Sequence, residues 1–76
     1  MNRYLPHVIF AVAEWNDKQT AGRALTPTEA SDAIKSMFDS KAARAGCGAA
    51  KVSTILQENH GWIKSGRMIM KSDDLV

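Results

Sequence analysis

The chain is poor in cysteine and histidine, and this scarcity excludes two ways of stabilising a small domain. Its 76 residues contain one cysteine, Cys47, and two histidines, His7 and His60. One cysteine cannot form an internal disulfide, and the histidines lack the spacing of a metal-binding motif. We therefore predict no metal and no cofactor. We also predict a reducing, cytoplasmic environment in which self-association is the remaining support for a small core.

Long hydrophobic runs are also missing. The apolar stretch over residues 5–13 contains His7 and continues directly into Glu14. It is too short to span a bilayer, and no cleavage-type region follows it as in a secretory signal peptide. Hydrophobic residues still make up 45% of the chain, which is typical of a globular protein. The length predicts a single domain over residues 1–76, with residues 72–76 as a flexible tail.

Acidic residues are scarce in the second half of the chain. Residues 1–40 carry four Lys and Arg against five Asp and Glu, whereas residues 41–72 carry six against Glu58 alone. The formal net charge of +2 is therefore unevenly spread. A basic half joined to a nearly neutral half indicates a one-sided surface for a polyanion.

Apolar residues recur at helical spacing in three segments. We expect helices over residues 3–18, from residue 27 to an end between residues 39 and 45, and over residues 49–59. Thr26-Pro27-Thr28-Glu29 predicts a capping box with proline at the first helical position. The predicted core-facing residues are Leu5, Val8, Ile9, Val12 and Trp15 in the first helix, Ala30, Ala33, Ile34, Met37 and Phe38 in the second, and Ala49, Val52, Ile55 and Leu56 in the third.

After Gly61, which we expect to end the third helix, the pattern changes to short strands. Residues 62–64 and 67–70 predict a hairpin around a turn at residues 65–66, where Gly66 can supply a positive φ. An isolated hairpin is only marginally stable, so it should pack on the helices through Trp62. Residues 23–25 are a candidate third strand beside it.

Two motifs resemble those of winged helix-turn-helix domains. Residues 25–29, Leu-Thr-Pro-Thr-Glu, look like the strand-to-helix junction of response-regulator output domains and other winged-helix regulators. Residues 52–56, Val-Ser-Thr-Ile-Leu, followed by Gly-Trp-Ile at 61–63, look like a recognition helix that leads into a wing. The resemblance covers residues 25–71. It implies a mainly α, three-helix winged helix-turn-helix fold with a short C-terminal β-hairpin, and a small transcriptional regulator that binds double-stranded DNA.

The chemistry of the residues, considered without the resemblance, also indicates a DNA-binding site. A helix can enter the major groove when one face is polar and the opposite face is anchored to a core, and the third helix has this division. The predicted DNA-binding residues are Lys51, Ser53, Thr54 and Gln57 on that helix, Lys64, Arg67 and Lys71 on or beside the hairpin, and Lys41 and Arg44 before the helix. Contacts with phosphates would position the protein, and the helix would supply any specificity.

Other functional classes remain open at this stage. The alternative is an adaptor or inhibitor module that uses the same scaffold to bind an acidic surface of a replication, transcription or defence complex. An enzyme is not predicted, because nothing assembles a nucleophile, a base and an orienting group. Cys47 is expected to be a small buried residue rather than a reactive thiol. For the DNA-binding regulator, the first helix, with Phe10 and Ala11 off its main stripe, is the predicted homodimer contact.

Overall fold

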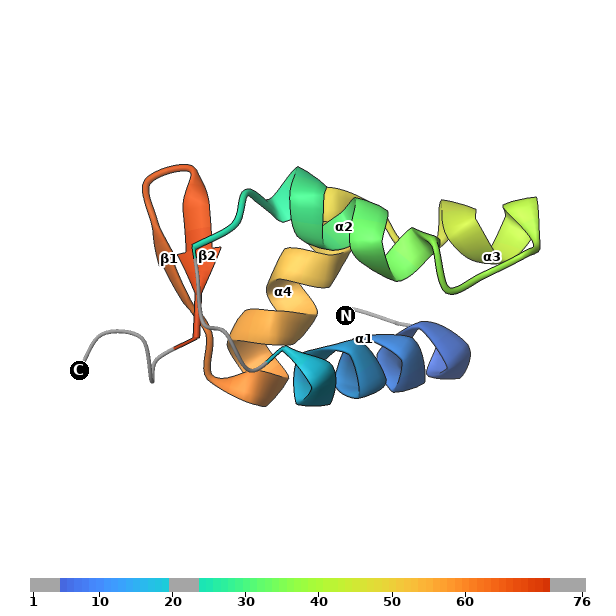
Figure 1. Cartoon of the computed structure of the whole chain (residues 1–76), viewed down its shortest axis with the longest axis horizontal. Helices are drawn as coiled ribbons and strands as arrows, with labels where there is room; N and C mark the ends of the chain where they lie inside the picture. The colour runs from blue at the N-terminus through green and yellow to red at the C-terminus, as the bar shows by residue number, and fades with distance from the viewer. Residues whose placement is uncertain (1–4, 20–23, 72–76) are drawn as a thin grey trace.

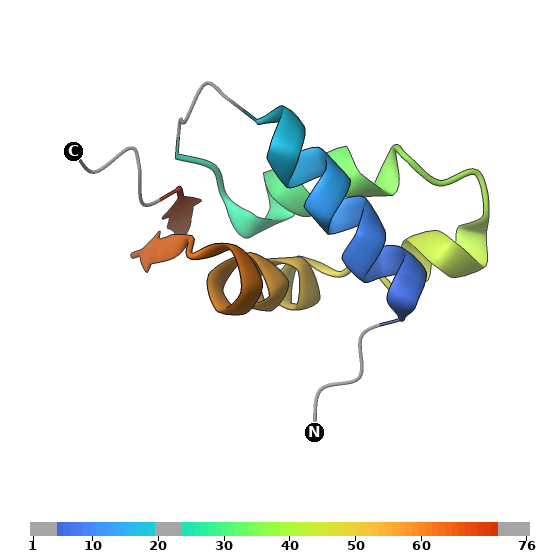
Figure 2. The ribbon, with the colours of Figure 1, turned by 90° about the horizontal axis from the view of Figure 1, so that it is seen from below.

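The structure, a computed structural model, describes residues 5–19 and 24–71, and these residues form four helices and one two-stranded hairpin. The elements are α1 (Pro6–Lys18), α2 (Pro27–Lys35), α3 (Lys41–Ala45), α4 (Ala49–His60), β1 (Ile63–Ser65) and β2 (Met68–Met70). The hairpin continues from the C-terminal end of α4, and α3 lies at the opposite end of the molecule (Figures 1 and 2). Arg23 and the tail over residues 72–76 lie outside the described residues.

The core forms where α1, α2 and α4 meet, with the most extensive contact between α2 and α4. Each of these three helices contributes one apolar side, because residues three and four apart lie on the same face. The rings of Trp15 and Trp62 lie 5.8 Å apart and join the end of α1 to the start of the hairpin. The buried apolar residues are Val8, Ala11, Val12, Trp15, Leu25, Ala30, Ile34, Cys47, Val52, Ile55, Leu56, Trp62 and Ile69.

The predicted face of α1 is only partly correct. Val8, Val12 and Trp15 are buried as expected, but Leu5 and Ile9 are exposed. Ala11, which was expected to lie off the main stripe, is buried instead. The side of α1 that packs on the core therefore excludes Leu5 and Ile9. These two residues and Phe10 form an apolar side that is exposed to solvent.

The start of α2 is confirmed as a capping box. The backbone N–H of Glu29 donates to the Thr26 hydroxyl over 3.1 Å, and the N–H of Thr26 donates to the Glu29 carboxylate over 2.9 Å. These bonds satisfy N–H groups that the first turn of a helix leaves without partners.

The prediction of three helices is wrong, because residues 41–45 form a helix of their own. Ser36 donates its hydroxyl to the carbonyl of Ala33 at the end of α2, and the N–H groups of Met37 and Phe38 bond three residues back. Such bonds tighten and end an α-helix. Ser40 then caps α3, its hydroxyl accepting from the N–H of Ala43 over 3.4 Å. Residues 41–45, which are compatible with a helix, therefore form a new helix and do not extend α2.

Gly61 ends α4 with a φ of +72°, a left-handed conformation that glycine adopts without steric cost. The helix extends one residue beyond the predicted range, to His60. The turn places Trp62 in the core, since its N–H donates back to the carbonyl of Leu56 over 3.1 Å.

The hairpin forms with its turn one residue later than predicted. The strands pair antiparallel, with Ile63 opposite Met70 and Ser65 opposite Met68, so Gly66 and Arg67 form the turn. Gly66 has a φ of +62°, as the first central residue of a II′ turn requires. Leu25 adds a single bridge on the other side of β2, exchanging hydrogen bonds of 2.9 and 2.7 Å with Ile69. The expected third strand is thus present as one residue.

Candidate functional site

One side of α4 is open to solvent, and three of the four residues of this helix that were predicted to bind DNA lie on it. Val52, Ile55 and Leu56 are buried on the opposite side against α1 and α2. The open side carries the partly exposed Lys51, Thr54 and Gln57, together with the exposed Ala50 and Glu58. This side therefore offers one cation, one anion and two neutral polar groups. The hydroxyl of Thr54 and the amide of Gln57 can both donate and accept hydrogen bonds.

Ser53 does not belong to this open side. Only 6% of its surface is exposed, and its hydroxyl accepts a hydrogen bond from the Gln57 amide over 2.8 Å. Position 53 faces the core because it lies three residues before the buried Leu56. Ser53 is therefore removed from the set of side chains that can reach a partner, and it serves to orient Gln57.

Thr54 and Gln57 retain unused hydrogen-bonding capacity. The Thr54 hydroxyl donates to the carbonyl of Ala50 over 2.9 Å, which leaves its lone pairs available. The Gln57 amide nitrogen is held by Ser53, but its oxygen accepts no hydrogen bond from another described residue. The two side chains are thus partly oriented before any partner binds.

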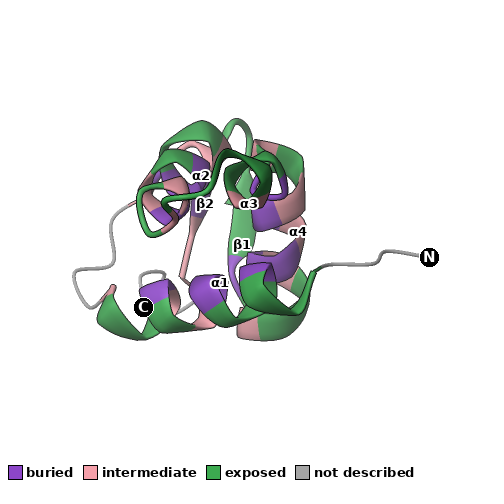
Figure 3. Cartoon of the chain, turned by 90° about the vertical axis from the view of Figure 1, so that its right-hand side faces the viewer, coloured by how far each residue is buried: buried purple, intermediate pink, exposed green. Residues whose placement is uncertain are grey.

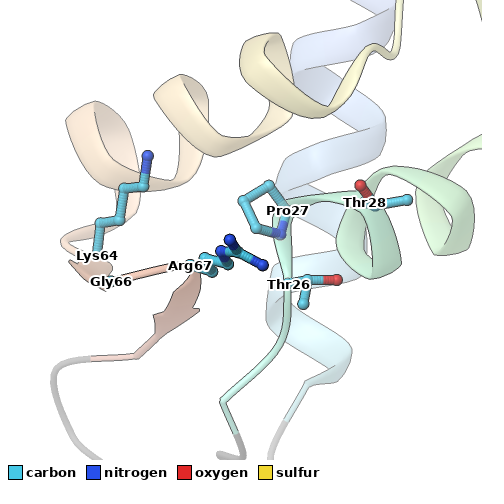
Figure 4. A pocket seen from close by; sticks show the side chains of 6 residues that line it. All are labelled: Thr26, Pro27, Thr28, Lys64, Gly66 and Arg67. Atoms are coloured by element: carbon cyan, nitrogen blue, oxygen red, sulfur yellow. The ribbon is translucent and has the colours of Figure 1, made fainter.

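The hairpin places two cations at an open pocket beside the start of α2. The pocket has a volume of about 430 Å³ and is lined by Thr26, Pro27, Thr28, Lys64, Gly66 and Arg67. Figure 4 shows the ammonium of Lys64 pointing towards α4 and the guanidinium of Arg67 lying near Thr26 and Pro27. Neither cation forms an ion pair or hydrogen bond with another residue of the described ranges.

The pairing in the hairpin explains these positions. Lys64 stands opposite Ile69, and paired residues project from the same face of an antiparallel pair. Since Ile69 is buried against the helices, the Lys64 stem also runs on the helix-facing side. Arg67 occupies the turn itself, at the tip nearest to Thr26. Glu29, the residue after the pocket residue Thr28, accepts the backbone N–H of Thr26 in the capping box.

Lys71 is separated from these cations. Its ammonium donates to the main-chain carbonyls of Asn16, over 3.1 Å, and of Gln19. A lysine is favourable at this position because carbonyls at a helix C-terminus lack partners and carry partial negative charge. Lys71, one of the predicted DNA contacts, therefore also has a structural role, because it joins the end of β2 to the end of α1.

Asn16 forms the centre of a polar network that holds the hairpin in place. Its side-chain oxygen accepts from the indole N–H of Trp62 over 2.6 Å, and its amide nitrogen lies 3.4 Å from Nδ1 of His60. Together with Lys71, these bonds connect α1, α4 and both strands. No local pattern predicts this network, because His60, Trp62 and Lys71 lie 44 to 55 residues after Asn16 in the chain.

Lys41 and Arg44 lie on α3, away from the pocket. Both are exposed, and the Nε of Arg44 donates to the carbonyl of Phe38 over 2.8 Å. The structure thus places the predicted site residues in three groups. Lys64 and Arg67 line the pocket at the hairpin, Lys51, Thr54 and Gln57 lie on the open side of α4, and Lys41 and Arg44 lie on α3.

Cys47 is fully buried, as predicted. Burial raises the pKa of its thiol above the usual value, and the charges of Lys35 and Lys51 only partly oppose this effect. A neutral thiol is a weak nucleophile. Within the described ranges, no three His, Cys, Asp or Glu side chains are grouped so that they could hold a metal ion, and no helix is long and apolar enough to cross a membrane.

Comparison of the chain with protein-family models, with curated proteins and with solved structures finds no match. The functional assignment therefore depends on the geometry of the open side of α4 and of the hairpin pocket. The contribution of Thr26 and Thr28 to the pocket was not predicted, although Thr26 was predicted as a cap. Only the folded chain brings these residues to the hairpin.

Proposed function

We propose that the chain is a double-stranded DNA-binding protein on a winged-helix scaffold, with α4 as the recognition helix and the hairpin as the wing. The order of elements supports this assignment: α1, the bridging residue Leu25, α2, α4 and then the hairpin. So does the strand arrangement, in which β2 lies between Leu25 and β1. The departure from a simple helix-turn-helix is α3, which lengthens the connection between α2 and α4.

The observation that carries the proposal is the position of Lys64 and Arg67 at the pocket beside α4 (Figure 4). When α4 lies in a major groove, these cations can meet the adjacent phosphates. Lys51, Thr54 and Gln57 then face base edges. The favourable free energy of such phosphate contacts comes mainly from the release of counterions from the DNA. The affinity should therefore fall steeply as the salt concentration rises. The protein would then be a small transcriptional regulator that recognises its DNA sequence with three side chains, Lys51, Thr54 and Gln57.

Fluorescence anisotropy with a labelled random-sequence duplex tests the proposal. We expect saturable binding at low salt, and we expect Arg67→Ala to reduce the slope of log affinity against log salt by about 0.9, the value for one phosphate contact. Arg67 is exposed and forms no ion pair with a residue of the described ranges, so its removal should leave the fold intact. Absence of binding by the wild-type protein at low salt would reject the proposal.

A second candidate function, a protein-binding adaptor or inhibitor, is supported by the outer side of α1. Leu5, Ile9 and Phe10 are exposed there, and 69% of the Phe10 surface is accessible. Contiguous exposed apolar residues often mark protein interfaces. The same side is the proposed contact of a homodimer. Phe10→Ser should abolish self-association or partner capture and leave duplex binding by the monomer unchanged, as measured by sedimentation and anisotropy.

A further inference from the structure

Helix α3 is ordered although it contributes no buried residue to the core. All five of its residues are exposed or intermediate, and Figure 3 shows it without any buried segment. A helix this short is not stable by itself in water. It must therefore be held by what precedes and follows it, and its exposed side is available for a partner.

Both ends of α3 are anchored. Before it, Phe38 packs partly against the core, meets the ring of His7 edge-on at 5.5 Å and accepts the hydrogen bond from Arg44. After it, Gly46 packs closely enough that a Cβ would lie 3.2 Å from a methyl carbon of Val8. The carbonyl of Cys47 then accepts from the buried hydroxyl of Ser31. The position of α3 is thus fixed relative to α1, α2 and α4.

The charge of α3 is positive and unpaired. Lys41 and Arg44 are three residues apart, so they lie on the same side of the helix, next to Ala45. Neither forms an ion pair with a residue in the described part of the chain. Asp39 is the only acidic residue between positions 36 and 48, and it precedes the helix.

The separation between α3 and the hairpin is no longer than one repeat of a duplex. The two elements lie at opposite ends of the longest dimension, which is 37 Å, and α4 lies between them (Figures 1 and 2). At about 3.4 Å per base pair, this length corresponds to roughly 11 base pairs, or about one helical turn. Phosphates one turn apart lie on the same side of a duplex.

We propose that α3 is a second backbone clamp, with Lys41 and Arg44 binding phosphates up to about one turn away from those bound by Lys64 and Arg67. This inference rests on the proposed DNA-binding function and makes it more specific. The partner is a duplex that extends along the whole long axis of the protein, and the segment that lengthens the connection between α2 and α4 becomes part of the interface.

The experiment combines duplex length with a single substitution. Affinity of the full chain is measured by anisotropy on duplexes of about 12 and about 8 base pairs, which do and do not span both clamps. On the longer duplex, Lys41→Ala should weaken binding about eightfold at 0.1 M salt and reduce the salt slope by about 0.9. On the shorter duplex, the same substitution should change the affinity less than about twofold, because one end is then unoccupied.

Lys18→Ala is the matched control. It lowers the net charge by the same amount, but Lys18 is the last residue of α1, away from both proposed clamps, and pairs with Glu14 over 3.6 Å. It should not change the salt slope on either duplex. Equal effects of Lys41→Ala on both duplexes, or an unchanged slope on the longer one, would overturn the clamp while leaving DNA binding intact. Failure of the wild-type protein to bind either duplex would overturn the proposed function as well.

Discussion

Asn16→Ala should destabilise the protein by removing the partner of a buried donor. The indole N–H of Trp62 donates to the Asn16 side chain over 2.6 Å, and only 5% of the Trp62 surface is exposed. Leaving such a donor without an acceptor costs about 1–3 kcal/mol. Each kcal/mol lowers the melting temperature of a domain of this size by about 4–8 °C. Urea denaturation should show a lower midpoint with an unchanged slope.

A double-mutant cycle separates this bond from other effects at position 16. In a Trp62→Phe background the donor is absent, so Asn16→Ala should cost at least about 1 kcal/mol less than in the wild type. Asp17→Ala, at the exposed neighbouring position, should change stability by less than about 0.5 kcal/mol. Additive effects of the Asn16 and Trp62 substitutions would refute the view that this bond fixes the hairpin on α1.

Three further predictions concern local features. Thr26→Ala should cost about 1 kcal/mol by removing the cap of α2, whereas Thr28→Ala, in the same turn, should cost less than about 0.5 kcal/mol; chemical denaturation compares the two. Gly66→Ala should cost about 1–2 kcal/mol because of its positive φ, whereas Gly48→Ala, at the N-cap of α4 with an extended backbone, should cost only roughly 0.5 kcal/mol, as thermal melts can show. The raised pKa of Cys47 means that the folded state keeps its proton where the unfolded chain loses it. The contribution of Cys47 to the free energy of unfolding should therefore be constant below pH about 8.5 and fall as the pH rises above it, and Cys47→Ala should reduce this fall in denaturation curves recorded across that range.

The elements with strong local signals were predicted well from the sequence. The capping box at Thr26 and the stop at Gly61 depend on hydrogen bonds and backbone preferences within a few residues, and both are confirmed. The hairpin was also predicted, but its turn was placed one residue early. Strand pattern alone fixes the register poorly when a strand has only three residues, and the pairing of Leu25 with Ile69 sets it here.

The remaining differences arise from tertiary packing. Helical spacing could not tell which side of α1 faces α4, because Leu5 and Ile9 are as apolar as the residues that are buried. The separate α3 depends on anchors at Phe38 and Gly46 that only the folded chain supplies. Likewise, Ser53 has a polar side chain, but its place on α4 buries it. The ammonium of Lys71 donates a hydrogen bond to a carbonyl at the end of α1, which the sequence could not indicate.

The central claim is that the open side of α4 and the hairpin pocket form the DNA-binding surface. Amide chemical shifts of the labelled protein, recorded while an unlabelled duplex is added at low salt, test it most directly. We expect the largest changes at Lys51, Thr54 and Gln57 on α4 and at Lys64 to Arg67 on the hairpin, with small changes along α1. Changes concentrated at Leu5 to Phe10, or no changes at all, would contradict the claim.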